Sequence, residues 1–200
     1  MEATLKRTLL LDVMSTLVYD PFYVEMPKFF GMSLTELMRE KHPTAWVEFE
    51  TGRWTEQEFL DNFFADGRRY DQAGFKEVTL SSYEWIPGIE ELLRELQESE
   101  VVMHVVSNYP KWYADIEAKL KLSRYLPWTY VSCDWGHRKP DPQVFSGLLG
   151  QLGLSPEATF FVDDNGANCD AAVNYGIDSH RFQDAEHLRK ALIAGKFLRP

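Results

Sequence analysis

The chain has 200 residues, of which 44% are hydrophobic and 26% are charged, as in an ordinary soluble globular protein. This length is enough for one large core, or for a core domain with a small accessory domain. The 21 Lys and Arg residues against 31 Asp and Glu residues give a net charge of −10, which disfavours nucleic acids and anionic lipid surfaces as partners.

Short apolar runs predict buried strands, and helical periodicity predicts the helices that follow them. The expected strands are Thr8–Asp12, Val101–Ser107, Tyr130–Cys133, which is the weakest, and Thr159–Asp163. The expected helices are Pro87–Glu98, Trp112–Leu122, Pro142–Leu152, Asn168–Tyr175 and Ala185–Ile193. This alternation predicts an α/β fold, a doubly wound parallel sheet with helices on both faces.

The stretch from residue 18 to residue 83 differs, because it is helical in pattern, rich in aromatic residues and free of strand-like runs. Ser33 and Thr55 are suitable N-caps, and Thr55 with Glu58 fits a capping box. The expected helices are Leu34–Lys41, Thr44–Glu50 and Thr55–Phe64. We therefore expect residues 1–17 and 84–200 to form the core domain, and residues 18–83 to form a small all-helical cap domain.

Polar residues stand at the ends of three predicted strands, namely Asp12, Ser107–Asn108 and Asp163–Asp164. In an open parallel sheet, ligands bind at the carboxyl ends of the strands, so these residues are expected to meet in one crevice. Adjacent carboxylates repel one another unless a cation neutralises them. Asp12, Asp163 and Asp164 together would form an oxygen-rich cluster suited to Mg²⁺.

The same residue types suit phosphoryl transfer. A carboxylate can attack phosphorus and split one hard step into two, while Ser107 can donate to a phosphoryl oxygen. Lys139, in a turn-rich loop before a predicted helix, is the candidate for the balancing cation. Each residue alone also fits an ordinary role, such as a turn cap for Asp12 or a solvated surface lysine for Lys139. The combination is more specific than any one residue.

Four segments resemble the sequence motifs of the haloacid dehalogenase (HAD) superfamily: Asp12–Leu17, Val106–Asn108, Arg138–Pro142 and Phe161–Asn168. The resemblance covers nearly the whole chain and implies Asp12 as nucleophile and Lys139 as charge balancer. It implies that the phosphate binds to Ser107, Asn108 and the loop of Met14, Ser15 and Thr16. It also implies Mg²⁺ as cofactor, held by Asp12, the backbone carbonyl of Met14, Asp163 and Asp164.

The chain is also similar to the plant and algal branch of this superfamily that includes flavin mononucleotide hydrolases. The segments that carry this similarity are Asp12–Tyr23, Lys41–Trp46 and Asn62–Arg68. It implies a small phosphorylated substrate, with flavin mononucleotide (FMN) as one candidate. Tyr19, Asp20 and Tyr23, just after the first motif, are expected to line the site. The sequence leaves open whether the protein is a monomer or a homodimer.

Position 14 departs from the superfamily pattern. Phosphatases of the superfamily usually carry Asp there as general acid, whereas the thioether of Met14 cannot donate a proton. Loss of a general acid costs about 10²–10⁴-fold in rate. Three outcomes stay open: a slow phosphatase with another acid, an enzyme for good leaving groups, or a catalytically silent phospho-ligand-binding protein.

A metal-independent 2-haloacid dehalogenase is a further alternative, because the dehalogenases of the superfamily also lack that Asp. They usually carry Tyr or Phe at this position and need no metal. The acidic pair Asp163–Asp164 therefore favours a metal-dependent phosphatase.

The cysteines and the N-terminus bear on the compartment. Cys133 and Cys169 lie in segments expected to be buried, which predicts free thiols in a reducing compartment. No apolar run approaches the roughly 18–20 residues needed to span a bilayer. The first strand is expected to begin near Leu5, which leaves no room for a signal or transit peptide. We therefore expect a cytoplasmic protein, or a protein of the plastid stroma if a transit peptide has been removed.

Overall fold

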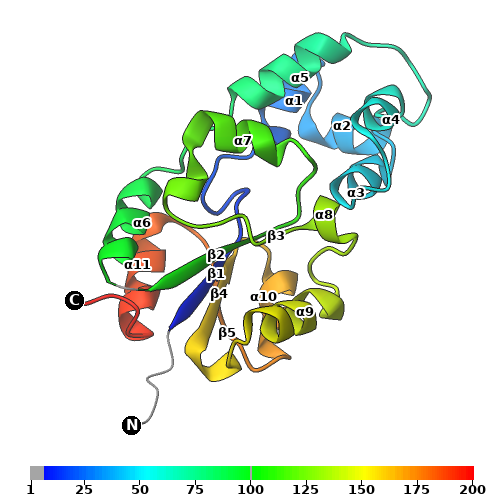
Figure 1. The fold of residues 1–200 in the computed structure, drawn as a ribbon. Helices are drawn as coiled ribbons and strands as arrows, with labels where there is room; N and C mark the ends of the chain where they lie inside the picture. The colour runs from blue at the N-terminus through cyan, green and yellow to red at the C-terminus, as the bar shows by residue number, and fades with distance from the viewer. Residues whose placement is uncertain (1–6, 100) are drawn as a thin grey trace.

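A computed structural model describes residues 7–99 and 101–200, and the expected strand start near Leu5 lies outside this range. Its centre is a five-stranded parallel sheet with the order β3-β2-β1-β4-β5 (Figure 1). The strands are β1 (Thr8–Leu11), β2 (Val102–Ser107), β3 (Tyr130–Val131), β4 (Thr159–Asp163) and β5 (Asp178–Arg181). Because β1 pairs with both β2 and β4, the ends of these three strands lie side by side.

Helices cover both faces of the sheet, as the sequence predicted. Leu9 and Leu11 of β1 pack in one hydrophobic cluster with α6 (Ile89–Glu98), α7 (Tyr113–Leu120) and α11 (Ala185–Ala194). Leu10 points to the opposite face, in a second cluster with α9 (Pro142–Leu152) and α10 (Gly166–Val173). Since successive side chains of a strand alternate between faces, this double burial explains the unbroken apolar run. The α/β prediction is confirmed.

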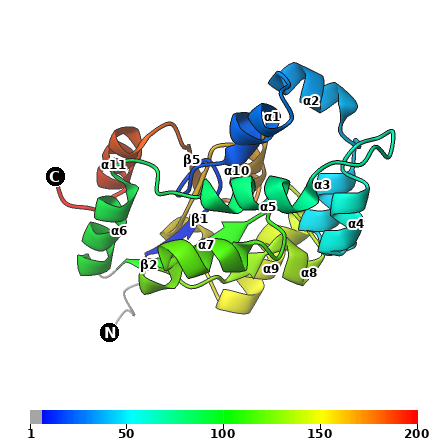
Figure 2. The ribbon, with the colours of Figure 1, turned by 90° about the horizontal axis from the view of Figure 1, so that it is seen from above.

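Five further helices lie between β1 and α6. They gather beyond the end of the sheet at which β1 ends (Figures 1 and 2). Ser33 and Thr55 are N-caps with complete capping boxes, formed with Glu36 and Glu58. The helices are α1 (Glu25–Phe29), α2 (Leu34–Glu40), α3 (Ala45–Glu50), α4 (Glu56–Asp61) and α5 (Gln72–Ser81).

Helices α1 and α5 were not among the expected cap helices, and two elements of the sheet domain also differ from the sequence prediction. The edge strand β5 was missed, because its residues Asp178–Arg181 are polar and pair on one side only, with β4. The strand predicted over Tyr130–Cys133 stops at Val131, because the short helix α8 (Ser132–Trp135) begins there. Neither difference moves the ends of β1, β2 and β4.

Aromatic side chains of α3 and α4 pack directly on the helix that follows β2. The Trp112 ring meets Phe49 and Phe59 edge to face, at centroid distances of 5.2 and 5.7 Å. The Trp112 indole N–H also donates to Glu56 at 2.6 Å. Ser132 Oγ donates to the backbone carbonyl of Glu50. Helices α3 and α4 therefore share a packed core with the sheet domain.

No helix in the described part of the chain is long and apolar enough to cross a membrane.

Glu50, which is 2% exposed and paired with Arg138, predicts a pH effect on stability. Burial raises the pKa of Glu50 from 4.5 to about 7, against the opposing effect of Arg138. Between these two pH values the unfolded chain releases the proton first, so this group makes the folded state less stable as the pH rises. As the pH rises through this range, we expect the free energy of unfolding of Glu50→Gln to fall by about 1–3 kcal/mol less than that of the wild type.

Urea denaturation at pH 4.5, 6 and 8 measures this effect. The matched control is Glu48→Gln on the same helix, because Glu48 is partly exposed and its hydrogen bond with Arg53 lowers its pKa. If the pH dependence of Glu50→Gln matched that of the wild type, burial of Glu50 would not be its cause.

Candidate active site

The loop after β1 begins with a tight turn that positions Asp12. The backbone N–H groups of Thr16, Leu17 and Val18 all point to the carbonyl of Val13. Ser15 has a φ of 57°, a left-handed conformation that non-glycine residues seldom adopt and that clusters at functional sites. The turn holds Asp12, which is 6% exposed, at the carboxyl end of the central strand.

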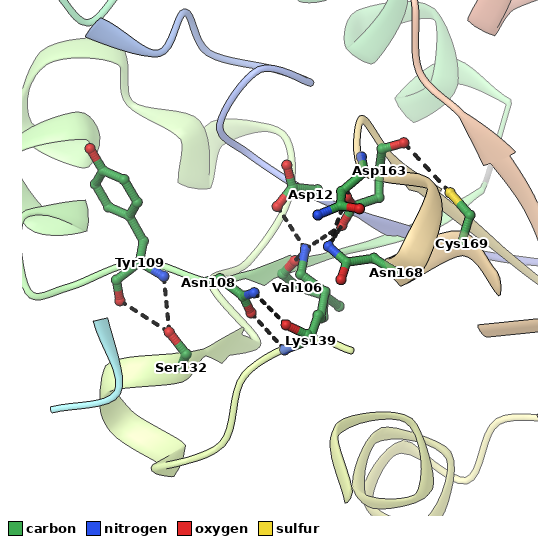
Figure 3. A network of polar contacts seen from close by, with 10 residues as sticks. Asp12, Val106, Asn108, Tyr109, Ser132, Lys139, Asp163, Asn168 and Cys169 are labelled. Atoms are coloured by element: carbon green, nitrogen blue, oxygen red, sulfur yellow. Dashed lines mark hydrogen bonds and ion pairs between the residues drawn. The ribbon is translucent and has the colours of Figure 1, made fainter. Parts of the chain in front are cut away.

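Lys139 lies between two carboxylates at this end of the sheet (Figure 3). Its Nζ donates to Asp12 at 2.7 Å, to Asp163 at 2.6 Å and to the backbone carbonyl of Val106 at 2.6 Å. The Lys139 side chain is fully buried. Asn168 donates to both carboxylate oxygens of Asp163, at 2.9 and 3.0 Å. The cluster thus joins Asp12, directly after β1, with residues of β2, β4, α10 and the loop before α9.

The carboxylates and the ammonium group of this cluster shift one another's pKa values. Burial raises the pKa of Asp12 to about 7, and Asp163 adds to the rise while Lys139 opposes it. Burial alone would lower the pKa of Lys139, but Asp12 and Asp163 outweigh it and the pKa is raised. Burial and the neighbouring Asp163 also raise the pKa of Asp164. One ammonium group therefore leaves the three carboxylates with an excess of negative charge.

The residues present fit a magnesium ion. Oxygen atoms of Asp12, Asp163 and Asp164 all lie within 4.8 Å of one another. All three ligand groups are carboxylates, the donor type that Mg²⁺ prefers. Lys139 pairs with Asp12 and Asp163, whereas Asp164 has no ion-pair partner in the described part of the chain. A divalent cation would supply the missing positive charge.

Two hydroxyl groups near the cluster have no partner. The Oγ of Ser107, at the end of β2, and the Oγ1 of Thr16, after the turn, are fully buried and form no hydrogen bond with the described residues. An unsatisfied buried hydroxyl costs roughly 1–3 kcal/mol, so such groups call for an explanation. Phosphoryl oxygens are acceptors that both hydroxyls could satisfy.

Asn108 holds the loop that carries Lys139. Its side-chain amide donates to the Lys139 carbonyl, and its amide oxygen accepts from the Lys139 N–H, both at 2.8 Å (Figure 3). The amide nitrogen has two hydrogens, so one N–H stays free for a ligand. The backbone N–H of the next residue, Tyr109, donates to Ser132 at 3.0 Å. The loops after β2 and β3 are thus fixed against each other.

A cavity of about 260 Å³ extends from this region toward α2 and α3. Met14, Asn108 and Tyr109 line it from the sheet domain, and Asp20 from the segment after the turn. The remaining wall is largely apolar and aromatic and is formed by Phe22, Tyr23, Met38, Lys41, Pro43, Trp46 and Val47. Such a lining suits a small organic group.

Lys41 is the cation of this cavity wall. Its side chain is half-buried and has neither a hydrogen bond nor an ion pair among the described residues. Burial lowers its pKa from the ordinary 10.5. An unpaired, partly desolvated ammonium is a ready donor for a polar ligand atom.

The structure brings most of the predicted site residues together. Asp12, Lys139, Asp163 and Asp164 form the charged cluster, and Tyr23 reaches the cavity with Met14 and Asn108. Tyr19 does not line the cavity, because its hydroxyl donates to Glu25 at 2.7 Å. Ser15 forms the turn itself, since its N–H donates to the carbonyl of Val18. The catalytic and ligand roles of all these residues stay predictions.

Three contributing residues were missed by the sequence reasoning. In the sequence Asn168 is only the last residue of the fourth motif, although it donates to both carboxylate oxygens of Asp163. Lys41 and Trp46 lie in one of the segments similar to the flavin mononucleotide hydrolase branch, and that similarity was the available signal.

Comparison with known proteins agrees with the fold. The family model for haloacid dehalogenase-like hydrolases matches residues 13–182. Flavin mononucleotide hydrolase 1 of Arabidopsis thaliana, named as chloroplastic, is 46% identical over 184 residues, which cover 92% of this chain and 75% of that protein. The chain therefore belongs to the haloacid dehalogenase-like hydrolase family.

Other proteins are similar to the chain in structure or over part of the sequence. A HAD family enzyme from Bacteroides thetaiotaomicron, solved with magnesium and inorganic phosphate, superposes with a TM-score of 0.76 at 22% identity, covering 92% of this chain and 98% of that one. Phosphoglycolate phosphatase 1 of Pseudomonas aeruginosa is 29% identical over 106 residues, which cover 48% of this chain and 39% of that protein.

Proposed function

We propose that this protein is a Mg²⁺-dependent phosphatase that hydrolyses a small phosphomonoester, with FMN as the substrate. The observation that carries the proposal is the buried cluster of Asp12, Lys139 and Asp163, with Asp164 beside it. The unpartnered hydroxyls of Ser107 and Thr16 favour a phosphoryl ligand. The FMN hydrolase of Arabidopsis thaliana supports the choice of substrate.

In the proposed reaction, a carboxylate oxygen of Asp12 attacks phosphorus and the alcohol leaves, which forms an aspartyl phosphate. Lys139 holds Asp12 in place and offsets its charge, while Ser107 and Thr16 donate to the phosphoryl oxygens. Asp12, the Met14 carbonyl, Asp163 and Asp164 would hold Mg²⁺, which when bound neutralises the phosphoryl charge. Water then attacks the phosphorus and regenerates Asp12.

Residues 18–83 are proposed to act as the cap of this site. Helices α2 and α3 form the wall of the cavity opposite Met14 and Asn108, so they would shield the aspartyl phosphate from bulk water. Trp46 offers a flat ring on this wall, and a planar heterocycle such as flavin could stack on it. We also propose a plastid location, because the Arabidopsis relative is named as chloroplastic.

Phosphate release from FMN, measured with Mg²⁺ and again with excess chelator, tests the proposed function. We expect turnover in Mg²⁺ and a loss of at least about 100-fold with chelator, because the carboxylate cluster then repels the phosphate dianion. A set of sugar phosphates and 2-haloacids serves as the comparison. Halide release without metal, or no phosphate release from any phosphomonoester, would contradict the proposal.

Substitution of Lys41 tests the recognition of the flavin. We expect Lys41→Met to raise the KM for FMN about 10–100-fold with a smaller change in kcat, because a hydrogen bond from a charged group contributes about 1.5–3 kcal/mol. The KM for p-nitrophenyl phosphate, whose ring offers fewer acceptors, should change less than threefold.

Lys28→Met is the matched control, because Lys28 is exposed on α1 and does not line the cavity. Equal changes of KM for both substrates would show that Lys41 does not contact the flavin.

A further inference from the structure

We propose that Asp20 is the acid that protonates the leaving group, in the role that Met14 cannot fill. This inference rests on the proposed phosphatase function and names the proton donor of that reaction. The cavity that Met14 lines holds one carboxyl group among its lining residues, and that group belongs to Asp20.

Backbone contacts after the turn bring Asp20 back to the site. After the turn at Ser15, Val18 forms bridges with both Met14 and Trp85, and the Tyr19 N–H donates to the Glu84 carbonyl. These bonds fix the segment that leads from the nucleophile strand to the cavity wall. Asp20 therefore reaches the same cavity as Met14, although six positions separate them in the sequence.

The Asp20 carboxyl group is positioned by one of its oxygens and free at the other. Its Oδ1 accepts from the Phe22 N–H at 2.9 Å, as the N-cap of the short 3₁₀ helix Pro21–Tyr23. Within residues 7–99 and 101–200, no other group forms a hydrogen bond with this side chain. A carboxyl group with one anchored oxygen can present the other, in its protonated form, to a substrate oxygen.

Other proton donors of the cavity are less suited. The Tyr109 hydroxyl is bonded to Tyr83 at 2.7 Å, and burial raises its pKa well above 10. Burial also raises the pKa of Tyr23, whose side chain is largely exposed. Lys41 stands on the cap wall, at the end of α2, whereas Asp20 follows directly on the nucleophile loop.

Near neutral pH, the environment of Asp20 keeps its carboxyl group protonated in a fraction of the molecules. Burial is the main cause that raises its pKa to about 6, and the negative charges of Asp164 and Glu25 add to the effect. Asp20 also helps to raise the pKa values of Tyr83 and Tyr109, so these hydroxyls stay uncharged near it. An acid whose pKa lies near the working pH is the most effective proton donor.

Asp20 gives up one proton and regains one in the proposed reaction. As the bond between Asp12 and phosphorus forms and the bond to the ester oxygen breaks, the Asp20 proton passes to that oxygen and the neutral alcohol leaves. Asp20 is then a carboxylate. It accepts a proton from the water that attacks the aspartyl phosphate, which releases hydrogen phosphate and restores both aspartates.

Two substrates with different leaving groups test this role in Asp20→Asn. The alcohol of FMN is a poor leaving group that needs a proton, whereas p-nitrophenolate leaves without one. We expect kcat to fall about 10²–10⁴-fold on FMN and less than tenfold on p-nitrophenyl phosphate. Asparagine keeps an oxygen for the Phe22 N–H, so the local fold is retained. Asp170→Asn, the same chemical change at an exposed position of α10, is the matched control.

A second variant separates proton donation from a structural role. Adding Met14→Asp to Asp20→Asn places a carboxyl group at position 14, and we expect it to restore kcat on FMN at least tenfold. Equal losses on both substrates, no loss on FMN, or no rescue by Met14→Asp would overturn the inference alone. A wild-type protein that hydrolyses neither substrate would overturn the proposed function together with it.

Discussion

The Asp12→Asn variant is expected to release phosphate from FMN at least about 10³-fold more slowly than the wild type, because an amide cannot attack phosphorus as a carboxylate does. The amide oxygen can still accept the hydrogen bond from Lys139, which donates at 2.7 Å in the wild type. The change therefore removes the nucleophile and leaves the packing around it intact. Stopped single turnovers with radiolabelled phosphomonoester should yield labelled protein for the wild type and none for the variant.

The control for this experiment is Asp170→Asn, which makes the same chemical change at an exposed position of α10. Its rate should stay within twofold of the wild type. If Asp12→Asn kept more than a tenth of the wild-type rate, covalent catalysis by Asp12 would be wrong and water would be the direct nucleophile.

The Lys139→Met variant is expected to unfold about 3–5 kcal/mol more easily at pH 7, because Asp12 and Asp163 would lose their buried cation. Mg²⁺ should restore part of this stability, since binding to the folded state alone stabilises it. Urea denaturation with and without Mg²⁺ measures both effects. The double variant Asp12→Asn with Lys139→Met should recover stability without metal, because it removes one of the two uncompensated charges.

Lys111→Met is the matched control for Lys139. Lys111 also pairs with a carboxylate, that of Asp134, but its side chain is 68% exposed. Exposed pairs contribute about 0–1 kcal/mol, so this variant should unfold almost as the wild type does. Equal destabilisation by the two variants would mean that the contribution of Lys139 to the free energy of unfolding does not depend on its burial.

The sequence predicted the sheet domain well, because its strands are buried on both faces. Such strands appear as unbroken apolar runs, as in Thr8–Leu11, and the helices between them have regular spacing. The strand β5 was missed for the opposite reason, since an edge strand with polar residues carries no such signal. The central strands also fixed the position of Asp12 and Asp163, because both directly end a buried strand.

The sequence could not predict which residues of the helical insertion reach the site. Tyr19 and Tyr23 are four positions apart, yet the Tyr19 hydroxyl bonds to Glu25 whereas Tyr23 lines the cavity. Their directions depend on the turn at Ser15 and on the bridge between Val18 and Trp85. The bridge joins residues more than sixty positions apart, which no local pattern encodes.

The aromatic contact between Trp112 and the helices α3 and α4 has a consequence for the evolution of substrate range. In a modular enzyme, an insertion could be exchanged between relatives as a unit. Here Trp112 of the sheet domain packs against Phe49 and Phe59 of the insertion and donates to Glu56. An insertion taken from a relative would need side chains that pack against the Trp112 ring in the same way. New substrate specificity in this lineage is therefore expected to arise by point substitutions in the cavity wall.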